Sequence, residues 1–453
     1  MVITRVLIID DQDSLLNSLR IFFELRGWEV TTASTGREGL KKARALQPSL
    51  VILDLRLPDI DGQEILERLR HEMPATQVIV VTAFQDMDNT IRCIKLGAFD
   101  FIHKPIDIDE LETALNRFSN VSKAQGAEPP VEAPLHSVSC EDSPYIVGKS
   151  QAMKDVFKKI AMVSDARVTV LIQGESGTGK ELVARAIHYQ GAYRTHPFMV
   201  VDCSTLVDTL TESQLFGYEK GAFTGAEMMR KGTLESAGEG TIFFDEIGEL
   251  PLRLQSKLLR FLHEKEYTRL GGTQPMHSEA RIIAATNRNL EQMASEGRMR
   301  TDLFYRLQVV TIYMPPLRDR RSDIPLLASS LLEKIGHKLR IPIKTLTNGA
   351  MQELEGYSWP GNVRQLENTL TKAAVLTKSS VLDKEDIIHA IGDLDRSSPE
   401  KGGVDKTLAE VEKEHILRVL NAKEGHLGQA CRTLGISRPT LRSKLKQYEV
   451  RQA

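Results

Sequence analysis

The stretch Val168–Glu181, VTVLIQGESGTGKE, joins a short apolar run to a glycine-rich loop that contains a lysine. The apolar, partly β-branched run predicts a buried strand, and the glycines after it predict a tight turn into a helix. Backbone amides in such a turn point inward and bind phosphate at the start of the helix. Lys180 adds a mobile positive charge for the outer phosphates. The spacing therefore predicts a phosphate-binding loop in an α/β domain.

A second apolar run, GTIFFDEIGEL at Gly240–Leu250, ends in two acids. Asp245 can hold the shell of a magnesium ion, and Glu246 can orient an attacking water. A buried strand that ends in acids is common for structural reasons alone, but its combination with the phosphate loop favours catalysis. Phosphate loops usually carry Ser or Thr after the lysine to hold magnesium, whereas this chain has Glu181 there. The ordinary hydroxyl ligand is therefore missing.

Composition limits the class of protein. The chain has 453 residues and a formal charge of −2, so we expect roughly three domains, and any nucleic-acid site must be local. The four cysteines, Cys93, Cys140, Cys203 and Cys431, are too far apart for a metal cluster or a disulfide framework. No apolar run reaches the roughly 18 residues of a membrane span. We expect a cytoplasmic protein without a membrane segment.

Two polar stretches divide the chain, one at Ser122–Pro144, rich in Pro, Ala, Ser and Glu, and one at Asp393–Lys406. We find no internal repeat. The expected boundaries are an N-terminal domain at 1–120, a linker at 121–144, a nucleotide-binding domain at 145–377, the end of a helical subdomain with a second linker at 378–406, and a C-terminal domain at 407–453.

The N-terminal segment alternates apolar runs, which begin at Val6, Leu50, Val78 and Asp100, with amphipathic stretches. This pattern predicts a parallel sheet whose polar strand ends lie along one edge. The residues at those ends are Asp10, Asp11, Asp54, Thr82 and Lys104. Three converging carboxylates would repel one another unless a cation bridged them, and their oxygens suit Mg²⁺. Asp54 then becomes a candidate nucleophile for a phosphoryl group; otherwise these acids only solvate a sheet edge.

The C-terminal segment has the pattern of a helix-turn-helix. Gly435 separates two helical stretches, Ser437 is a good N-cap, and Leu441 and Leu445 have the spacing of an inward helix face. The second helix is strongly basic, as a helix that enters the major groove would be, although a solvated basic helix is the plainer alternative. The candidate DNA-binding residues are Arg438, Thr440, Arg442, Lys444 and Lys446.

The N-terminal segment resembles a response-regulator receiver domain over its whole length, on the acid pair, on Asp54 in DLRLPDIDG, on Thr82 and on Lys104 before a proline. The resemblance implies a flavodoxin-like fold, phosphorylation of Asp54 by a sensor histidine kinase, and Phe101 as the switch aromatic. Leu57 stands where the family often has methionine.

The central block, from Ile146 to about Thr377, resembles the AAA+ domain of NtrC-like enhancer-binding proteins. The shared motifs are GESGTGKE, ESQLFGYEKGAFTGA, GTIFFDEIGELP, AATNRNL, FYRL, PPLRDRRSDIP and WPGNVRQLEN. The resemblance implies ATP hydrolysis with Mg²⁺ that drives RNA polymerase carrying sigma-54, with glutamate usual at position 181. The implied nucleotide residues are Gly174, Glu175, Ser176, Gly177, Thr178, Gly179, Lys180 and Glu181, with Asp245 on the metal.

The same resemblance assigns further roles. Asn287 corresponds to sensor one, Arg364 to sensor two, and Arg300 and Arg306 to arginines that reach across a ring interface. Asp202 departs from the family, which often has an asparagine there that restrains the catalytic glutamate; a carboxylate cannot donate that hydrogen bond unless it is protonated.

The hexapeptide GAFTGA, Gly221, Ala222, Phe223, Thr224, Gly225 and Ala226, resembles the loop with which the family contacts sigma-54. An ordinary turn packed on its own domain is the alternative. The C-terminal segment resembles a Fis-type domain, although GHLGQAC departs from the usual sequence. We therefore predict a receiver, an AAA+ P-loop ATPase and a small all-α helix-turn-helix domain. A dimer bound to enhancer DNA would assemble into a hexameric ring. A DNA-binding repressor with a vestigial ATPase and a general AAA+ unfoldase are the alternatives.

Overall fold

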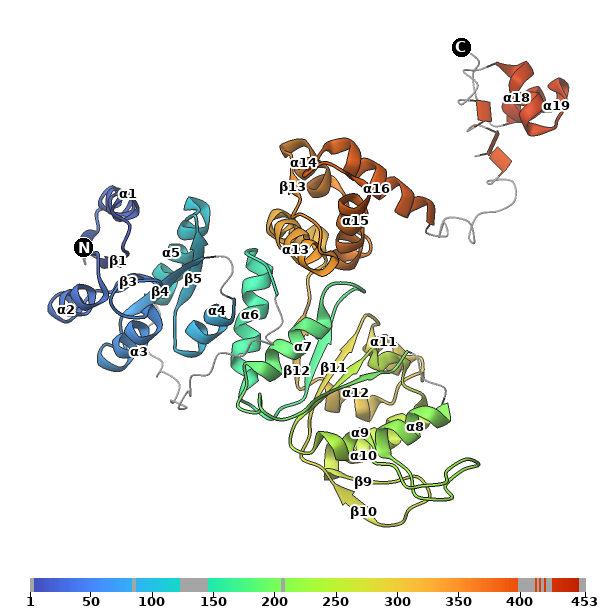
Figure 1. The fold of residues 1–453 in the computed structure, drawn as a ribbon, viewed down its shortest axis with the longest axis horizontal. Helices are drawn as coiled ribbons and strands as arrows, with labels where there is room; N and C mark the ends of the chain where they lie inside the picture. The colour runs from blue at the N-terminus through green and yellow to red at the C-terminus, as the bar shows by residue number, and fades with distance from the viewer. Residues whose placement is uncertain are drawn as a thin grey trace. The chain divides into compact units, whose positions relative to one another are not determined.

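The computed structural model describes residues 4–83, 87–122, 146–204, 208–397 and 426–447, with the short stretches 412–413, 415–416 and 419–420. These residues form two compact units, 1–387 and 388–453, which we describe separately (Figure 1). The linker predicted at 121–144 lies outside the described residues from position 123 onward, as does the second linker from 398 to 406. Among the described helices, none is both long and apolar enough to cross a membrane.

The N-terminal domain is a five-stranded parallel sheet in the order β2-β1-β3-β4-β5. Its elements are β1 (Arg5–Ile9), α1 (Asp13–Glu24), β2 (Glu29–Ala33), α2 (Gly36–Leu46), β3 (Leu50–Asp54), α3 (Gly62–Glu72), β4 (Gln77–Ala83), α4 (Met87–Lys95), β5 (Asp100–Lys104) and α5 (Ile108–Ser122). This is the predicted flavodoxin-like fold. The strand β2 was not predicted, because EVTTA has too few apolar residues to stand out as a buried run.

Both faces of this sheet are buried, which explains the continuous apolar runs in its strands. Val6 and Ile8 lie in one core with α1 and α5, and Leu7 and Ile9 lie in the other with α2 and α3. Because the strand order reverses between β1 and β3, their carboxyl ends flank the crevice where ligands of such sheets bind.

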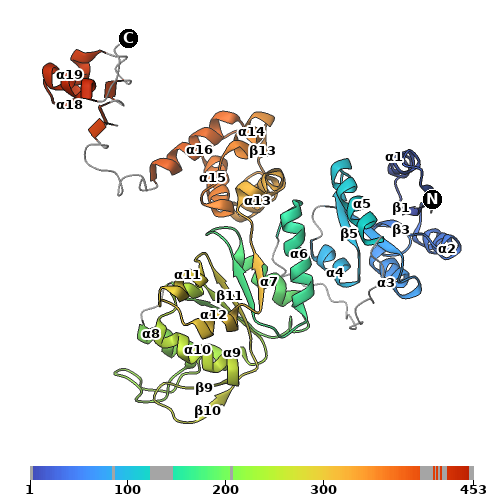
Figure 2. The same ribbon diagram turned by 180° about the vertical axis from the view of Figure 1, so that it is seen from behind.

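The central domain contains a second parallel sheet, in the order β12-β6-β11-β8-β7. Figure 2 shows this sheet from behind, among its helices. The strands are β6 (Val170–Gln173), β7 (Phe198–Asp202), β8 (Thr241–Asp245), β11 (Arg281–Thr286) and β12 (Val310–Tyr313). The helices are α6 (Gln151–Ser164), α7 (Lys180–Tyr189), α8 (Asp208–Phe216), α9 (Thr233–Ala237), α10 (Leu252–Glu264), α11 (Leu290–Ser295) and α12 (Thr301–Leu307). A small antiparallel pair, β9 (Glu266–Thr268) and β10 (Pro275–His277), follows α10.

A helical subdomain follows the sheet. It comprises the short turns η2 (Leu317–Asp319) and η3 (Arg321–Asp323), the helices α13 (Ile324–Leu339), α14 (Asn348–Gly356), α15 (Asn362–Leu376) and α16 (Lys384–Ser397), and the parallel pair β13 (Thr345–Leu346) and β14 (Val381–Leu382). Asp323 accepts hydrogen bonds from the backbone amides of Lys149 and Ser150, 2.7 Å each, and so ties this subdomain to the start of α6.

The second unit contains the predicted helix-turn-helix, formed by α18 (Leu427–Leu434) and α19 (Arg438–Gln447). Gly435 adopts a left-handed φ of 66°, as the turn between the helices requires. The Ser437 hydroxyl accepts a hydrogen bond from the Thr440 amide at 3.3 Å. Leu441 and Leu445 are buried in the small core, as their spacing predicted.

Candidate functional site

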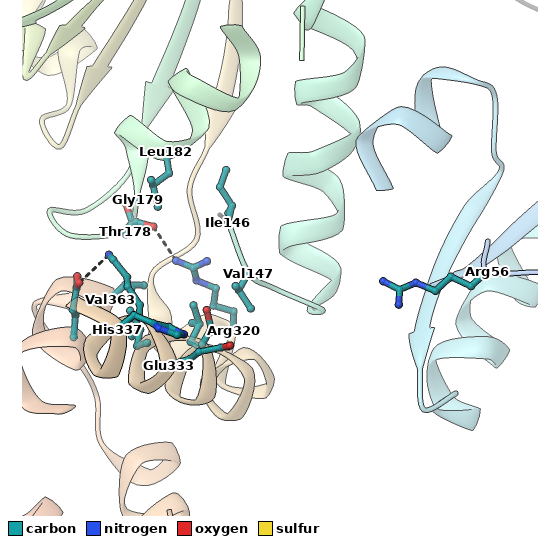
Figure 3. A pocket seen from close by; sticks show the side chains of 15 residues that line it. Arg56, Ile146, Val147, Thr178, Gly179, Leu182, Arg320, Glu333, His337 and Val363 are labelled. Atoms are coloured by element: carbon teal, nitrogen blue, oxygen red, sulfur yellow. Dashed lines mark hydrogen bonds and ion pairs between the residues drawn. The ribbon is translucent and has the colours of Figure 1, made fainter. Parts of the chain in front are cut away.

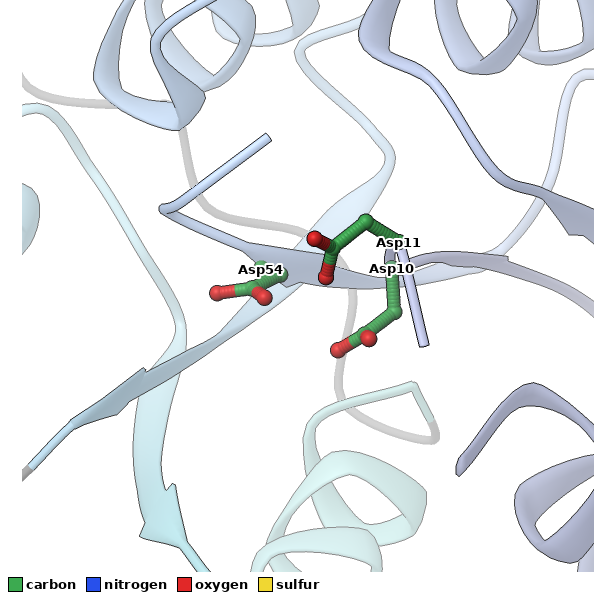
Figure 4. Close-up of side chains that lie close together, drawn as sticks. All are labelled: Asp10, Asp11 and Asp54. Atoms are coloured by element: carbon green, nitrogen blue, oxygen red, sulfur yellow. The ribbon is translucent and has the colours of Figure 1, made fainter. Parts of the chain in front are cut away.

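Three carboxylates meet at the crevice of the N-terminal sheet (Figure 4). Asp10 and Asp11 follow β1, Asp54 ends β3, and one oxygen from each lies within 4.8 Å of the others. Lys104, from the end of β5, places its Nζ 2.8 Å from Asp10 and 2.6 Å from Asp54. Thr82, at the end of β4, is buried. All five predicted residues of this edge therefore lie at or next to strand ends. Four of them, Asp10, Asp11, Asp54 and Lys104, lie close together.

Burial controls the charges of this cluster. Burial raises the pKa of Asp10, against the opposing hydrogen bond from Lys104. Burial by itself would lower the pKa of Lys104, but hydrogen bonds to Asp10 and Asp54 outweigh it and raise that pKa. The lysine therefore remains charged beside the acids. The donor set, three carboxylates with hard oxygens, fits Mg²⁺.

The strand that carries Lys104 also contacts the ATPase domain within the first unit. The backbone carbonyl of Phe101 accepts a hydrogen bond of 2.9 Å from Lys154 of α6, and the same Nζ lies 2.5 Å from Glu110. Lys154 is buried, and its Nζ lies 5.0 Å from the centre of the Phe101 ring. Because a buried charge is costly without partners, moving β5 would require this lysine to change its contacts.

The loop Gly174–Glu181 connects β6 to α7, as its sequence predicted. Gly177 and Gly179 have φ values of 76° and 101°, which residues with a Cβ rarely adopt. The buried Lys180 donates to the carbonyls of Gly174, at 3.1 Å, and Glu175, at 3.4 Å. Glu181 instead forms an ion pair with Arg185 at 2.7 Å on the exposed side of α7. Glu181, the residue after the lysine, therefore forms an ion pair on the surface of the helix.

The acid pair at the end of β8 lies beside this lysine. One Glu246 carboxylate oxygen accepts from Lys180 Nζ at 3.2 Å, and the other accepts from the backbone amide of Asn287 at 3.0 Å. Glu246 also has a left-handed backbone, φ 50°, which is costly for a residue other than glycine. Burial, reinforced by the Glu246 charge, raises the pKa of Asp245.

Asp202 stands beside Asp245 in the register of β7 and β8. Its Oδ1 accepts hydrogen bonds from the Ser204 amide, at 2.8 Å, and the Ser204 hydroxyl, at 2.6 Å. A carboxylate is an acceptor, so ionised Asp202 cannot hold the Glu246 carboxylate by a hydrogen bond. In this chain Lys180 and the Asn287 amide hold Glu246.

The helical subdomain reaches the phosphate loop through polar contacts. Arg364, which was predicted to be the sensor-two arginine, donates to the Ser176 hydroxyl at 3.2 Å. Arg318 forms a two-pronged ion pair with Glu175, with distances of 2.6 and 2.8 Å. Asn362 donates to the same Glu175 at 3.1 Å.

Arg320 adds a further contact, because it donates to the Thr178 carbonyl at 3.0 Å (Figure 3). No role was predicted from the sequence for Arg318, Arg320 or Asn362. Their position in the motifs PPLRDRRSDIP and WPGNVRQLEN was the sequence feature that could have identified them.

A cavity of about 750 Å³ adjoins the loop, and its mostly apolar lining includes residues of the loop, the chain before α6 and the helical subdomain (Figure 3). Ile146 and Val147 line it beside Thr178 and Gly179, and Leu331 and Val363 come from the helical subdomain. Apolar walls next to a phosphate loop suit the flat base of a nucleotide.

The two candidate interface arginines lie at α12. Arg300 forms an ion pair of 2.7 Å with Asp302, and Arg306 donates to the Leu262 carbonyl at 3.3 Å. In the part of the chain that the structure describes, neither forms a hydrogen bond or ion pair with the phosphate loop of the same chain.

The GAFTGA hexapeptide forms a closed loop. Tyr218 and Arg230 exchange two backbone hydrogen bonds of 3.0 Å at its base, and the Gly221 amide donates to the Ala226 carbonyl at 2.8 Å. Phe223 is 43% exposed, and its ring forms a T-shaped pair with the ring of Tyr218 at a centroid distance of 5.0 Å. The aromatic side chain is therefore supported on one side and open to solvent on the other.

The candidate DNA-binding residues lie on α19 or just at its start. Arg438, Thr440 and Arg442 are exposed. Lys444 is half-buried and forms an ion pair with Glu412 at 2.6 Å. The side chain of Lys446 lies outside the described residues.

Family models match nearly the whole chain. The response regulator receiver domain matches residues 6–116, the Sigma-54 interaction domain 146–313, the AAA+ ATPase lid domain 318–403, and the Fis family of bacterial regulatory proteins 407–448. These matches define a class: a receiver joined to a sigma-54-interacting ATPase and a DNA-binding domain.

Full-length relatives agree. The chain is 40% identical to the regulatory protein AtoC of Escherichia coli K12, over 99% of this chain and 98% of AtoC. It is 36% identical to the DNA-binding transcriptional regulator NtrC of the same strain, over 98% of both chains. The crystal structure of NtrX from Brucella abortus with ADP has a TM-score of 0.52 and 30% identity, over 99% of this chain and 100% of NtrX.

The chain therefore belongs to the family of NtrC-like, sigma-54-dependent response regulators. It is a two-component regulator that activates sigma-54 transcription, and its central domain is a nucleotide-binding AAA+ ATPase. The receiver implies phosphorylation by a kinase, and the other domains imply sigma-54 and DNA as partners. These findings confirm the predicted fold and function, and the repressor alternative is not favoured.

The contacts of Glu246 give a prediction for hydrolysis. We expect Glu246→Gln to lower kcat for ATP by about 10²- to 10⁴-fold, because the amide cannot activate a water, while nucleotide binding persists. We expect Asp202→Ala to change kcat only a few-fold, because Lys180 and the Asn287 amide already hold Glu246. Steady-state ATPase assays and equilibrium nucleotide binding measure both effects. A loss in Asp202→Ala as large as in Glu246→Gln would contradict this assignment.

Proposed function

We propose that phosphorylation of Asp54 controls an ATP-driven ring that remodels sigma-54 RNA polymerase from enhancer DNA. The observation that carries this proposal is the pair of lysine–acid sites, Lys104 on Asp54 and Lys180 on Glu246, each at the carboxyl edge of a parallel sheet. Both sites offer a positive charge and acids at the place where a phosphoryl group would sit. ATP turnover measured with and without sigma-54 polymerase tests the proposal against a repressor or an unfoldase.

At the receiver, a sensor histidine kinase would donate the phosphoryl group to an Asp54 oxygen. Asp10, Asp11 and Asp54 would hold Mg²⁺, which would neutralise charge around the transferred group. Lys104 would then bond to the new phosphoryl oxygens in place of the carboxylate, and Thr82 and Phe101 would respond to that change. The support is the geometry of Asp10, Asp54 and Lys104, whose charged atoms lie within hydrogen-bonding distance.

At the ATPase, the loop Gly174–Glu181 would cradle the phosphates, and Asp245 would hold the Mg²⁺ shell. Lys180 would exchange the Glu246 carboxylate for phosphate oxygens, which would free Glu246 to orient water. Arg364 already donates a hydrogen bond to Ser176 of this loop. The backbone amide of Asn287 donates to Glu246, which lies beside the loop.

Assembly would complete this site. Arg300 and Arg306 would come from a neighbouring subunit in a homo-oligomer, a dimer that assembles into a hexameric ring. An arginine supplied in this way contributes about 10³- to 10⁵-fold in related phosphoryl-transfer reactions, so hydrolysis should depend on protein concentration. We place the protein in the cytoplasm, where a kinase, polymerase and DNA are all accessible.

We also propose the domain boundaries 1–120, 121–144, 145–377, 378–406 and 407–453, which the matched ranges 6–116, 146–313, 318–403 and 407–448 support.

The GAFTGA loop would contact sigma-54 through Phe223 and Thr224, and α19 would enter the major groove of enhancer DNA.

Thr224→Ala tests the division of labour in the ATPase domain. We expect the variant to keep most ATPase activity, because the loop lies outside the nucleotide site, and to lose open-complex formation. ATP turnover and permanganate footprinting of a sigma-54 promoter measure the two activities. Loss of both activities together would show that the loop is not a separate contact.

Arg442→Ala tests the DNA interface. Arg442 is exposed on α19, so if it reads a guanine edge we expect specific binding to weaken by about 1 to 3 kcal/mol. Arg432→Ala is a matched control, because Arg432 is exposed on the first helix, α18. Fluorescence anisotropy at fixed salt measures both. An equal loss in the two variants would indicate only general electrostatic attraction.

Deletion of residues 1–120 tests the direction of control, which we propose to be positive. Four residues of the linker, Gly126, Pro129, Pro130 and Pro134, oppose a rigid helical clamp between the domains. These positions lie outside the described residues. We expect the truncated protein to assemble and hydrolyse ATP less well than the phosphorylated full-length chain, with both measured against protein concentration. A truncated protein that is constitutively more active would show that the receiver represses.

A further inference from the structure

We propose that Met228 and Met229, together with Phe223, form a single apolar surface that binds an apolar segment of sigma-54. The inference rests on the proposed function of the GAFTGA loop and extends the contact beyond the hexapeptide. Neither methionine belongs to the GAFTGA motif that predicted the loop, and no role was predicted for either from the sequence.

The three side chains belong to one loop. The base is closed where Tyr218 and Arg230 exchange two backbone hydrogen bonds of 3.0 Å, so residues 219–229 emerge together. Phe223 is 43% exposed, Met228 78% and Met229 47%. A single exposed apolar side chain is ordinary in a soluble domain, but three of them within seven positions of one loop are not.

The base of the loop is firmly held, so the exposure is not the result of a poorly folded segment. The Glu219 amide donates to the Leu270 carbonyl at 3.0 Å, and the Leu270 amide donates to the Gly217 carbonyl at 2.9 Å. Arg269 forms ion pairs with Glu219, at 2.7 Å, and with Glu235, at 2.8 Å. The loop therefore presents its apolar side chains from a fixed platform.

The chemistry of the surface fits a protein partner. Glu227, Arg230 and Lys231 are exposed beside the apolar side chains and provide a charged rim. Aromatic residues and methionine are enriched in the centres of protein interfaces, and charged residues surround such centres. Methionine is unbranched and polarizable, so it can adapt to a partner surface that moves during a remodelling cycle.

Sigma-54 is the occupant that the position favours. The loop lies within residues 146–313, which match the Sigma-54 interaction domain, and the methionines emerge from the same closed loop as Phe223. A neighbouring copy of this chain is the competing occupant, and the experiment below separates the two.

The test uses the full-length chain with the double substitution Met228→Ser and Met229→Ser. Binding of fluorescently labelled sigma-54 is measured in the presence of ADP and aluminium fluoride, and the mass of the assembly is measured by light scattering. We expect the affinity for sigma-54 to fall on the order of tenfold, as for truncation of central interface side chains, with the same assembly mass. The double substitution Met228→Leu and Met229→Leu should bind sigma-54 as the unaltered protein does, because leucine keeps the apolar surface.

Met162→Ser is the matched control, because Met162 is 76% exposed on α6, away from the loop in sequence. It should bind sigma-54 as the unaltered protein does. Unchanged sigma-54 binding by the double serine variant would overturn the inference, and so would a change in assembly mass that by itself accounts for the lost binding.

Thr224→Ala distinguishes this inference from the proposed function. If Thr224→Ala loses sigma-54 binding and the double serine variant does not, only the methionine surface is wrong. If Thr224→Ala binds sigma-54 and supports open-complex formation normally, the proposed role of the whole loop is wrong.

Discussion

Parallel pairing of strands is the constraint on which both candidate sites depend. In a parallel sheet all carboxyl ends lie along one edge, so residues that follow different strands meet there even when they are far apart in the chain. Asp10, Asp54 and Lys104 come from β1, β3 and β5 of the first sheet. In the second sheet the phosphate loop follows β6 and the acid pair follows β8, with β11 between the two strands. The same geometry therefore serves two kinds of phosphate chemistry in one chain.

Each site contains a lysine whose charge is already paired, partly buried in the case of Lys104 and buried in the case of Lys180. Lys104 contacts Asp10 and Asp54, and Lys180 contacts Glu246. A buried charge without a partner costs several kcal/mol, so these acids stabilise the lysines when no phosphate is present. In the proposed function, an incoming phosphoryl group would compete with the carboxylates for the N–H donors of the lysine ammonium. In the proposed ATPase cycle, Lys180 would turn from Glu246 to phosphate, and the backbone amide of Asn287 would still hold Glu246, the residue proposed to orient water.

Two departures from common patterns are explained by local contacts. Glu181 stands where many phosphate loops have a hydroxyl residue, and the structure pairs it with Arg185 on the exposed side of α7. Asp202 stands where the family often has asparagine, and its carboxylate accepts from Ser204. Glu246 is held by Lys180 and by the backbone amide of Asn287, and neither contact involves residue 202. The restraint on Glu246 therefore does not require asparagine at position 202.

Local sequence was sufficient for the features that depend on short stretches of chain. Apolar runs predicted four of the five receiver strands, glycine spacing predicted the phosphate loop, and Gly435 with Ser437 predicted the turn between α18 and α19. The strand β2 was missed because its partly polar residues are stabilised by pairing with β1 rather than by their own pattern. The contacts of Arg318, Arg320 and Asn362 with the phosphate loop also could not be read from spacing, since they join residues more than 140 positions apart. Such contacts exist only after the helical subdomain has packed on the sheet, because long-range packing, and not local propensity, fixes their distances.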